Sequence, residues 1–228
     1  MKQKTTASKM LIGLDEAGRG PVLGPLVMAA LAIKEENLKK LEWMGVKDSK
    51  LLSAQAREEL FEQIRDVVED FRIEMIEPDA IDLSVNDGET NLNWLEADTS
   101  ARMISELNPD IIIIDCPSPN IKAYQEYFAS RLSKAIREKA KLIVEHKADV
   151  NHIIVGAASI VAKVIRDRHI DRLKTEIGID FGSGYMSDPK TQDFLKMHYK
   201  THPRLFRKSW QSYKDVEDAE KQRKLGEF

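Results

Sequence analysis

The sequence contains one cysteine and no long hydrophobic run, and both absences narrow the choice of protein class. A lone Cys116 excludes internal disulfides and cysteine-rich metal cages, so a reducing cytoplasm is the expected compartment. The longest apolar run, residues 22–33, is interrupted by Gly24 and Pro25 and is too short to cross a membrane. The polar residues 1–10 are unlike a secretory signal. We therefore expect a cytoplasmic protein with one core-bearing domain and a modest extension.

The chain also lacks a strong excess of charge of either sign. Its 35 basic and 38 acidic residues give a net charge of −3, which taken alone argues weakly against a nucleic-acid partner. The distribution is uneven, because residues 163–214 carry 12 Lys and Arg against 6 Asp and Glu. A basic segment beside an acidic body suits polyphosphate binding next to a carboxylate site, and unevenly charged solvated surface explains it equally well.

Periodicity and chain-breaking residues predict an α/β fold. Residues 111–114 are four consecutive isoleucines, as in a strand that is buried on both faces. The helical connections make strands 10–14, 111–114 and 142–145 mutually parallel, within a mixed sheet flanked by helices. The remaining predicted strands are 22–33 and 71–76, and the predicted helices are 53–69, 90–107, 124–139, 152–176 and 190–199.

Acidic residues follow each of the three predicted parallel strands. The first strand runs into Asp15 and Glu16, the second into Asp115, and the third, after three residues, reaches Asp149. Parallel strands end at one edge of a sheet, where open α/β sheets place their sites, so these carboxylates are expected to meet. An acidic residue at a strand end can also simply cap a turn or a helix. The coincidence of three strand ends favours a shared site.

Four carboxylates at one place would repel one another and raise each other's pKa unless cations neutralise them. Hard oxygen ligands suit Mg²⁺ or Mn²⁺, which leave coordination positions open for water and phosphate. Two such ions about 4 Å apart can activate a water and stabilise the leaving oxygen of a phosphodiester. The sequence therefore predicts a two-metal phosphodiesterase site.

A glycine-rich turn, residues 18–24, follows the first strand and superficially resembles a dinucleotide-binding loop. Asp15 and Glu16 would then stand beside a pyrophosphate, and Pro25 spoils the helix that should hold it, so a nicotinamide enzyme is disfavoured. The turn instead lets backbone amides approach a ligand and offers one guanidinium, that of Arg19, to a phosphate.

Other basic and aromatic residues are candidates for substrate contacts. Lys47 and Lys50 suit phosphate oxygens, although a solvated turn is an equal alternative. Tyr185 offers a flat face and a hydroxyl, and it could also be a half-buried loop aromatic. Helix 152–176 carries a basic stripe whose ordinary explanation is a surface face; its members are Lys163, Arg166, His169 and Arg172.

The combined motifs resemble ribonuclease HII, the type 2 ribonucleases H, in family order over nearly the whole chain. The Glu-His-Lys-Ala-Asp form at 145–149 is more similar to archaeal members. Met186 after the tyrosine and the nine residues before the first strand depart from the pattern. The matching segments are Asp15–Pro21 with Gly24-Pro25, Gly45–Lys50, Asp115, Glu145–Asp149, Ala157–Val164 with Arg166-Asp167, Gly182–Tyr185 with Ser187–Pro189, and Arg207–Trp210.

The resemblance implies an RNase H-like catalytic domain over residues 1–176 and a C-terminal helical extension over 177–228. It implies a monomeric endonuclease that cleaves the RNA strand of RNA/DNA hybrids, and cleaves 5′ of ribonucleotides embedded in DNA, leaving 5′-phosphate and 3′-hydroxyl ends. Its implied roles are ribonucleotide removal and DNA replication and repair. The implied ligands of two Mg²⁺ or Mn²⁺ ions are Asp15, Glu16, Asp115 and Asp149.

The resemblance further implies how the substrate is recognised. The turn of Gly18, Arg19 and Gly20, together with Tyr185, would recognise the ribonucleotide 2′-hydroxyl, and the tyrosine would stack on the neighbouring sugar. A 2′-hydroxyl is the group that distinguishes RNA from DNA. A non-catalytic nucleic-acid-binding module on the same fold is the main alternative, and clustered carboxylates argue against it because they repel a phosphate backbone.

The tail, about residues 218–228, carries a spacing typical of sliding-clamp (PCNA) binding peptides. Gln222, Leu225 and Phe228 are three residues apart, so one helical turn places the two apolar side chains on a common side. Such peptides usually carry two adjacent aromatics, whereas this segment carries one. A frayed charged terminus is the alternative.

Overall fold

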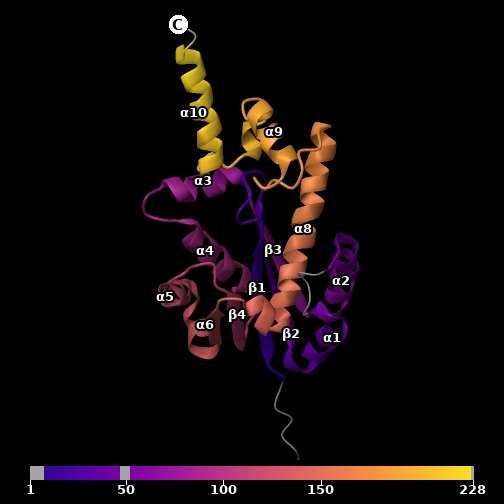
Figure 1. The fold of residues 1–228 in the computed structure, drawn as a ribbon. Helices are drawn as coiled ribbons and strands as arrows, with labels where there is room; N and C mark the ends of the chain where they lie inside the picture. The colour runs from indigo at the N-terminus through magenta and orange to yellow at the C-terminus, as the bar shows by residue number, and fades with distance from the viewer. Residues whose placement is uncertain (1–7, 47–51, 227–228) are drawn as a thin grey trace, which may run out of the picture. The chain divides into compact units, whose positions relative to one another are not determined.

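The sheet of the computed structural model (Figure 1) has five strands in the order β3-β2-β1-β4-β5, and it is a mixed sheet. Strands β1 and β4 are parallel, with Leu14 opposite Ile114, and β4 and β5 are parallel, with Ile114 opposite Val144. The predicted parallel arrangement is therefore confirmed. The strands are β1 Met10–Ala17, β2 Leu26–Lys34, β3 Asp70–Ile76, β4 Ile111–Asp115 and β5 Lys141–Glu145.

The structure describes residues 8–46 and 52–226. Within these ranges no helix is long and apolar enough to span a membrane. The short 3₁₀ segments η1 and η3 are Glu35–Asn37 and Pro203–Leu205. The α-helices are α1 Leu38–Trp43, α2 Ala54–Val67, α3 Pro78–Asn86, α4 Leu92–Ile104, α5 Ile121–Arg131, α6 Lys134–Lys139, α7 Ala148–Asn151, α8 Ile153–Ile177, α9 Pro189–His198 and α10 Gln211–Gly226.

The chain divides into two compact units. Unit 1 is Met1–Ala17, Met28–Glu74 and Glu96–Val164, and unit 2 is Gly18–Val27, Met75–Leu95 and Ile165–Phe228. Unit 2 has its own core, whose buried members are Val22, Leu23, Ile170, Phe181, Phe194, Leu195, Tyr199, Phe206 and Tyr213. The division into a catalytic domain and an extension after residue 176 stays a prediction.

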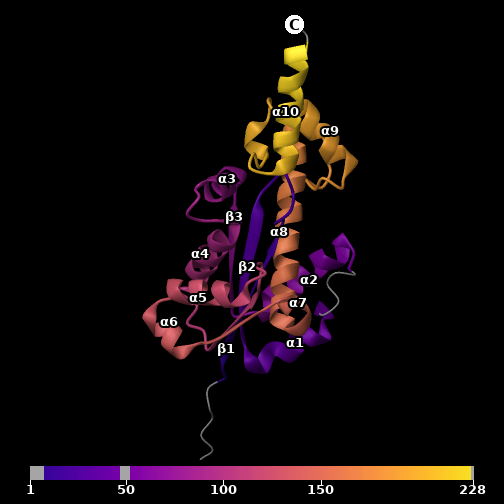
Figure 2. The same ribbon diagram turned by 60° about the vertical axis from the view of Figure 1, so that its left-hand side comes forward.

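Helices cover both sides of the strands in unit 1. Figures 1 and 2 show α5 and α6 on one side and α1 and α2 on the other. Ser53 caps α2, because its side chain accepts a hydrogen bond from the Ala56 amide. Gly13 of β1 permits a close packing of α8, since a Cβ there would lie 2.7 Å from the backbone carbonyl of Ile154. This approach brings the beginning of α8 onto β1. The preceding helix, α7, contacts β4.

Most predicted elements shift at their ends, and two differ from the structure more clearly. The predicted helix 124–139 is two helices, because Ser133 accepts a hydrogen bond from the Ile136 amide and begins α6 as a new helix. The predicted strand 22–33 begins only at Leu26. Before it, the Val22 amide donates to the carbonyl of Gly184, so this residue belongs to the loops of unit 2 and not to the sheet.

Candidate active site

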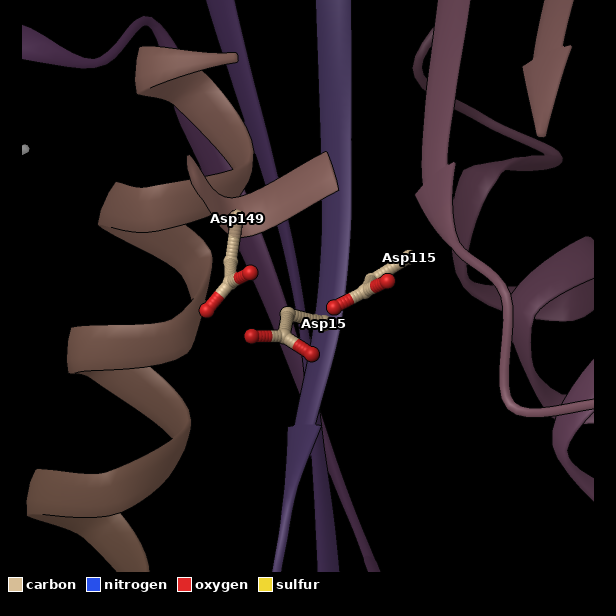
Figure 3. A group of neighbouring side chains, drawn as sticks. All are labelled: Asp15, Asp115 and Asp149. Carbon is tan, nitrogen blue, oxygen red and sulfur yellow. The ribbon is translucent and has the colours of Figure 1, made fainter. Parts of the chain in front are cut away.

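Three carboxylates lie together in unit 1, and each comes from a different segment (Figure 3). Asp15 is on β1, Asp115 ends β4, and Asp149 is in α7, just after β5. One carboxylate oxygen from each of the three lies within 4.8 Å of the others. Asp15 and Asp149 are buried, and Asp115 is partly buried. The structure thus brings together three of the four residues that the sequence proposes as metal ligands.

Local backbone geometry places Asp149 beside Asp115. Lys147 adopts a left-handed conformation with φ 62°, which turns the chain sharply after β5 and starts α7. The Ala148 amide then donates to Oδ1 of Asp115 over 3.3 Å. Gly156 of α8 fits closely against this turn, because a Cβ there would lie 2.9 Å from the carbonyl oxygen of Asp149.

Burial dominates the electrostatics of the cluster. Desolvation raises the pKa of Asp15 to about 7, although hydrogen bonds from the Ser159 side chain and the Glu16 amide oppose that rise. The neighbouring charges of Asp115 and Asp149 raise the pKa of Asp15 further. Three clustered carboxylates, two of them buried and one partly buried, repel one another and fit a hard divalent cation, which would neutralise them.

The raised pKa of Asp15 predicts a pH-dependent stability of the metal-free protein. Between pH 4 and 7 the folded protein holds a proton on Asp15 that the unfolded chain releases, because the ordinary carboxyl pKa is 3.8. Stability present below pH 4 is therefore lost as the pH rises to about 7. We expect Asp15→Asn to be more stable than the parent in EDTA, with a gap that grows to a few kcal/mol by pH 8.

Urea unfolding of both proteins at several pH values between 5 and 8 measures this gap. Adding Mg²⁺ at pH 8 should stabilise the parent protein and leave Asp15→Asn nearly unchanged, because a ligand that binds only the folded state raises its stability. A gap that does not change with pH would contradict the assignment of the raised pKa to Asp15.

Glu16 is not part of the three-carboxylate group. It is the next residue on β1 and half-buried, and neighbouring side chains on a strand point to opposite faces. Its amide donates to Oδ1 of Asp15 over 2.8 Å, which helps to orient that carboxylate. The role of Glu16 as a metal ligand stays a prediction.

The predicted recognition turn and Tyr185 lie side by side in unit 2. A Cβ at Gly20 would be 3.7 Å from Cε1 of the Tyr185 ring, and Tyr185 as a residue is 39% exposed. Gly18 has φ +83°, and a side chain there would overlap Arg166, so only glycine suits this position. Nη2 of Arg19 donates to Oδ1 of Asn93 over 2.6 Å, which holds its guanidinium in place.

Sequence reasoning missed two polar groups that the structure places at these sites. Ser159 of α8 is buried and hydrogen-bonds to Asp15; its signal in the sequence is a lone hydroxyl among apolar residues of that helix. Arg166 does not belong to a solvated basic stripe, since it is 4% exposed and its guanidinium lies 5.3 Å from the ring centroid of Tyr185. Its side chain also donates to the carbonyl of Ser183 over 3.2 Å.

The remaining predicted contacts are only partly described. Lys47, Lys50 and Phe228 lie outside the described residues. Gln222 is exposed on α10, and Leu225 belongs to the same helix. The dinucleotide alternative is excluded by the fold, because the glycine turn leads into strand β2 instead of a helix.

Comparisons with known proteins give a consistent result. The family model for ribonuclease HII matches residues 12–213. The ribonuclease HII of Pyrococcus furiosus is 41% identical over 93% of this chain and 93% of its own length. The crystal structure of ribonuclease H2 from Pyrococcus horikoshii OT3 has a TM-score of 0.82 and 38% identity, covering 92% of this chain and 98% of that one. The structure of the PCNA:RNase HII complex from Archaeoglobus fulgidus has a TM-score of 0.77 and 35% identity, covering 90% of this chain and 96% of that one.

Proposed function

Because this chain belongs to the ribonuclease HII family, we propose that the cluster of Asp15, Asp115 and Asp149 is its catalytic centre. The chain is a metal-dependent endonuclease that cleaves RNA in RNA/DNA hybrids and at ribonucleotides embedded in DNA. The observation that carries the proposal is the approach of three carboxylate oxygens to within 4.8 Å at the ends of neighbouring segments. Glu16 is proposed as the fourth ligand.

The proposed cofactors are two Mg²⁺ or Mn²⁺ ions, held by these carboxylates. Such ions, when bound, activate a water and stabilise the leaving oxygen of a phosphodiester. The protein itself orients the carboxylates that would bind these ions. Ser159 and the Glu16 amide hydrogen-bond to Asp15 and favour its charged form. The Ala148 amide donates a hydrogen bond to Asp115 and orients that carboxylate.

Substrate recognition is proposed for unit 2. The amides of the Gly18-Arg19-Gly20 turn would contact the 2′-hydroxyl, and Tyr185 would stack on the neighbouring sugar. The position of Gly20 beside the tyrosine ring supports a common role for them, since a Cβ at Gly20 would lie 3.7 Å from that ring. Arg19, positioned by Asn93, is proposed to contact a phosphate, and Lys47 and Lys50 are proposed to contact others.

The decisive assay is cleavage of a DNA duplex that carries one ribonucleotide. Cleavage is expected to require added Mg²⁺ or Mn²⁺ and to stop when EDTA removes the metal, because the carboxylates alone repel the phosphate. An all-DNA duplex of the same sequence is the control and should stay intact. Binding of the substrate without cleavage under any metal condition would support a non-catalytic binding module instead.

Tyr185 is predicted to serve recognition more than affinity. Tyr185→Ala should lower the cleavage rate at an embedded ribonucleotide by about tenfold or more, because stacking on the substrate contributes roughly 1–3 kcal/mol. Duplex binding, measured by fluorescence anisotropy, should weaken far less. Tyr127→Ala is a control tyrosine, since Tyr127 lies on α5 and hydrogen-bonds to Asp98. Parallel losses of binding and cleavage in Tyr185→Ala would make it a general contact.

The proposed partners and setting follow the family. We assign this monomeric enzyme to the cytoplasm and to ribonucleotide removal during DNA replication and repair. A sliding clamp of the PCNA type is a proposed partner, because a related protein of 35% identity was solved in complex with PCNA. The proposed contact residues are Gln222, Leu225 and Phe228.

A further inference from the structure

Arg207 is the largest fully buried side chain among the described residues, and it is 0% exposed. Its guanidinium donates to backbone carbonyls of the glycine turn. Nη2 donates to Gly18 over 2.6 Å, and Nη1 donates to Arg19 over 2.8 Å. Nε and Nη2 also donate to Gly24, over 3.1 and 2.9 Å. One side chain thus joins both ends of the segment 18–24.

Trp210 holds the third carbonyl of the recognition turn. Its indole Nε1 donates to the carbonyl of Gly20 over 3.1 Å, and its ring lies 5.0 Å from the guanidinium carbon of Arg207. Consecutive carbonyls of Gly18, Arg19 and Gly20 therefore all accept hydrogen bonds from this pair. Holding three successive carbonyls leaves the turn little rotational freedom.

The direction of these carbonyls determines where the amides of the turn point. In a trans peptide the carbonyl and the N–H point in opposite directions. The carbonyls of Gly18 and Arg19 face Arg207, so the N–H groups of Arg19 and Gly20 point away from it. Residue 21 is proline and has no N–H, so the turn presents these two amides as donors on the side that faces away from Arg207.

Asp82 of α3 fixes the segment that carries both side chains. It is buried and accepts hydrogen bonds from the amides of Lys208 and Ser209, each over 2.8 Å, and from the Ser209 hydroxyl over 2.5 Å. Arg207 and Trp210 flank these two residues. A carboxylate with three donors is a rigid anchor, and it holds the arginine and the tryptophan in one orientation.

We propose that Arg207 and Trp210 are positioning residues for ribonucleotide selectivity. They fix the turn so that its two amides meet the 2′-oxygen, and this inference rests on the proposed role of the turn in recognition. Burying a guanidinium costs free energy. Apolar side chains would suffice to cover a loop whose peptide groups need no fixed orientation, so the buried arginine indicates that this orientation matters. Lysine cannot replace it, because an ammonium lacks the planar fork that reaches several acceptors at once.

The test compares binding of two duplexes by proteins that carry Asp115→Asn, so that no substrate is cut. One duplex contains a single ribonucleotide, and the other is all DNA. We define the selectivity as the Kd for all-DNA divided by the Kd for the ribonucleotide duplex. Arg207→Lys should lower the selectivity by about tenfold, and Trp210→Phe, which removes one donor and keeps the ring, by about threefold.

Two controls separate positioning from general damage. Arg204→Lys makes the same change at an exposed arginine nearby, and it should keep the parent's selectivity. Mn²⁺ affinity, measured in proteins with Asp115 intact, should be unchanged in Arg207→Lys, because the carboxylate cluster belongs to unit 1. If Arg207→Lys does not fold, judged by circular dichroism, the result for Trp210→Phe decides.

Each outcome has a defined meaning. Selectivity that survives both substitutions would overturn the proposal, and so would a parallel loss of affinity for both duplexes, which indicates a purely structural role. If the Asp115→Asn parent itself shows no preference for the ribonucleotide, the proposed role of the turn fails, and this inference fails with it. If the Asp115→Asn parent prefers the ribonucleotide duplex and the Arg207 and Trp210 variants do not, the result supports both the role of the turn and the positioning role of these residues.

Discussion

Asp115→Asn and Asp15→Asn are each expected to lower turnover on a duplex with one ribonucleotide by at least about two orders of magnitude. The loss corresponds to about 2.7 kcal/mol of transition-state stabilisation. Asparagine keeps the shape of the side chain and removes the negative charge that a divalent cation requires. The metal would therefore bind weakly or in the wrong place, and the stabilisation that it supplies to the reacting phosphate would be lost.

The control for these variants is Asp66→Asn, which makes the same change at an exposed residue of α2. It should leave turnover unchanged. Turnover is measured at saturating substrate and saturating metal, so that a weakened metal affinity alone does not account for the loss. The variants should stay folded, because removing a charge from a buried site relieves repulsion. Near-normal turnover in either variant would remove that residue from the catalytic centre.

The carboxylate site could be predicted from the sequence because its causes are local. Each acidic residue follows a strand that its own apolar run identifies, and parallel strands end at a common edge. The four isoleucines before Asp115 belong to β4, which pairs in parallel with β1 and β5 as predicted. No knowledge of distant contacts was needed to expect Asp15 and Asp115 near each other.

The surroundings of the recognition turn could not be predicted in the same way, because they depend on distant contacts. Arg166 recurs at the spacing of a surface stripe, yet the loop at 183–185 covers it. Arg207 lies 189 residues from Gly18, to which it donates. No local sequence feature distinguishes a buried arginine from an exposed one. Periodicity therefore placed Arg166 on a solvent-exposed face and predicted no role for Arg207.

The tail illustrates a different limit. The sequence predicted one helical turn at the clamp-binding spacing, and the resemblance implied a helical extension without the bounds of its helix, whereas the structure forms one helix, α10, over Gln211–Gly226. Side-chain pairs four residues apart support this helix, since Gln211 donates to Asp215 over 2.8 Å and Lys221 donates to Glu217 over 3.0 Å. Such pairs contribute a few tenths of a kcal/mol each to helix stability. A helix that depends on them and has no apolar stripe is therefore difficult to predict from the sequence.

Deleting residues 222–228 is expected to abolish association with the cognate sliding clamp. Gln222 is exposed on α10, and residues three apart in sequence, such as 222 and 225, are neighbours on a helix surface. Leu225 and Phe228 would fill an apolar pocket of the clamp, while Gln222 supplies a polar anchor. Removing all three leaves no anchor, so calorimetry with the purified clamp should show a Kd weakened by at least about a hundredfold.

Cleavage of a short free duplex should be unchanged in the truncated protein, because the proposed catalytic carboxylates and the recognition turn all precede residue 222. A matched pair of full-length variants separates sequence from length. Leu225→Ser with Phe228→Ser should lose the clamp as the truncation does, whereas Arg223→Ser with Glu227→Ser, which keeps the three anchors, should retain affinity within a few-fold. Undiminished affinity in the truncated protein would place the clamp contact elsewhere in the chain, and equal losses in both double variants would reduce the tail to a general electrostatic contact.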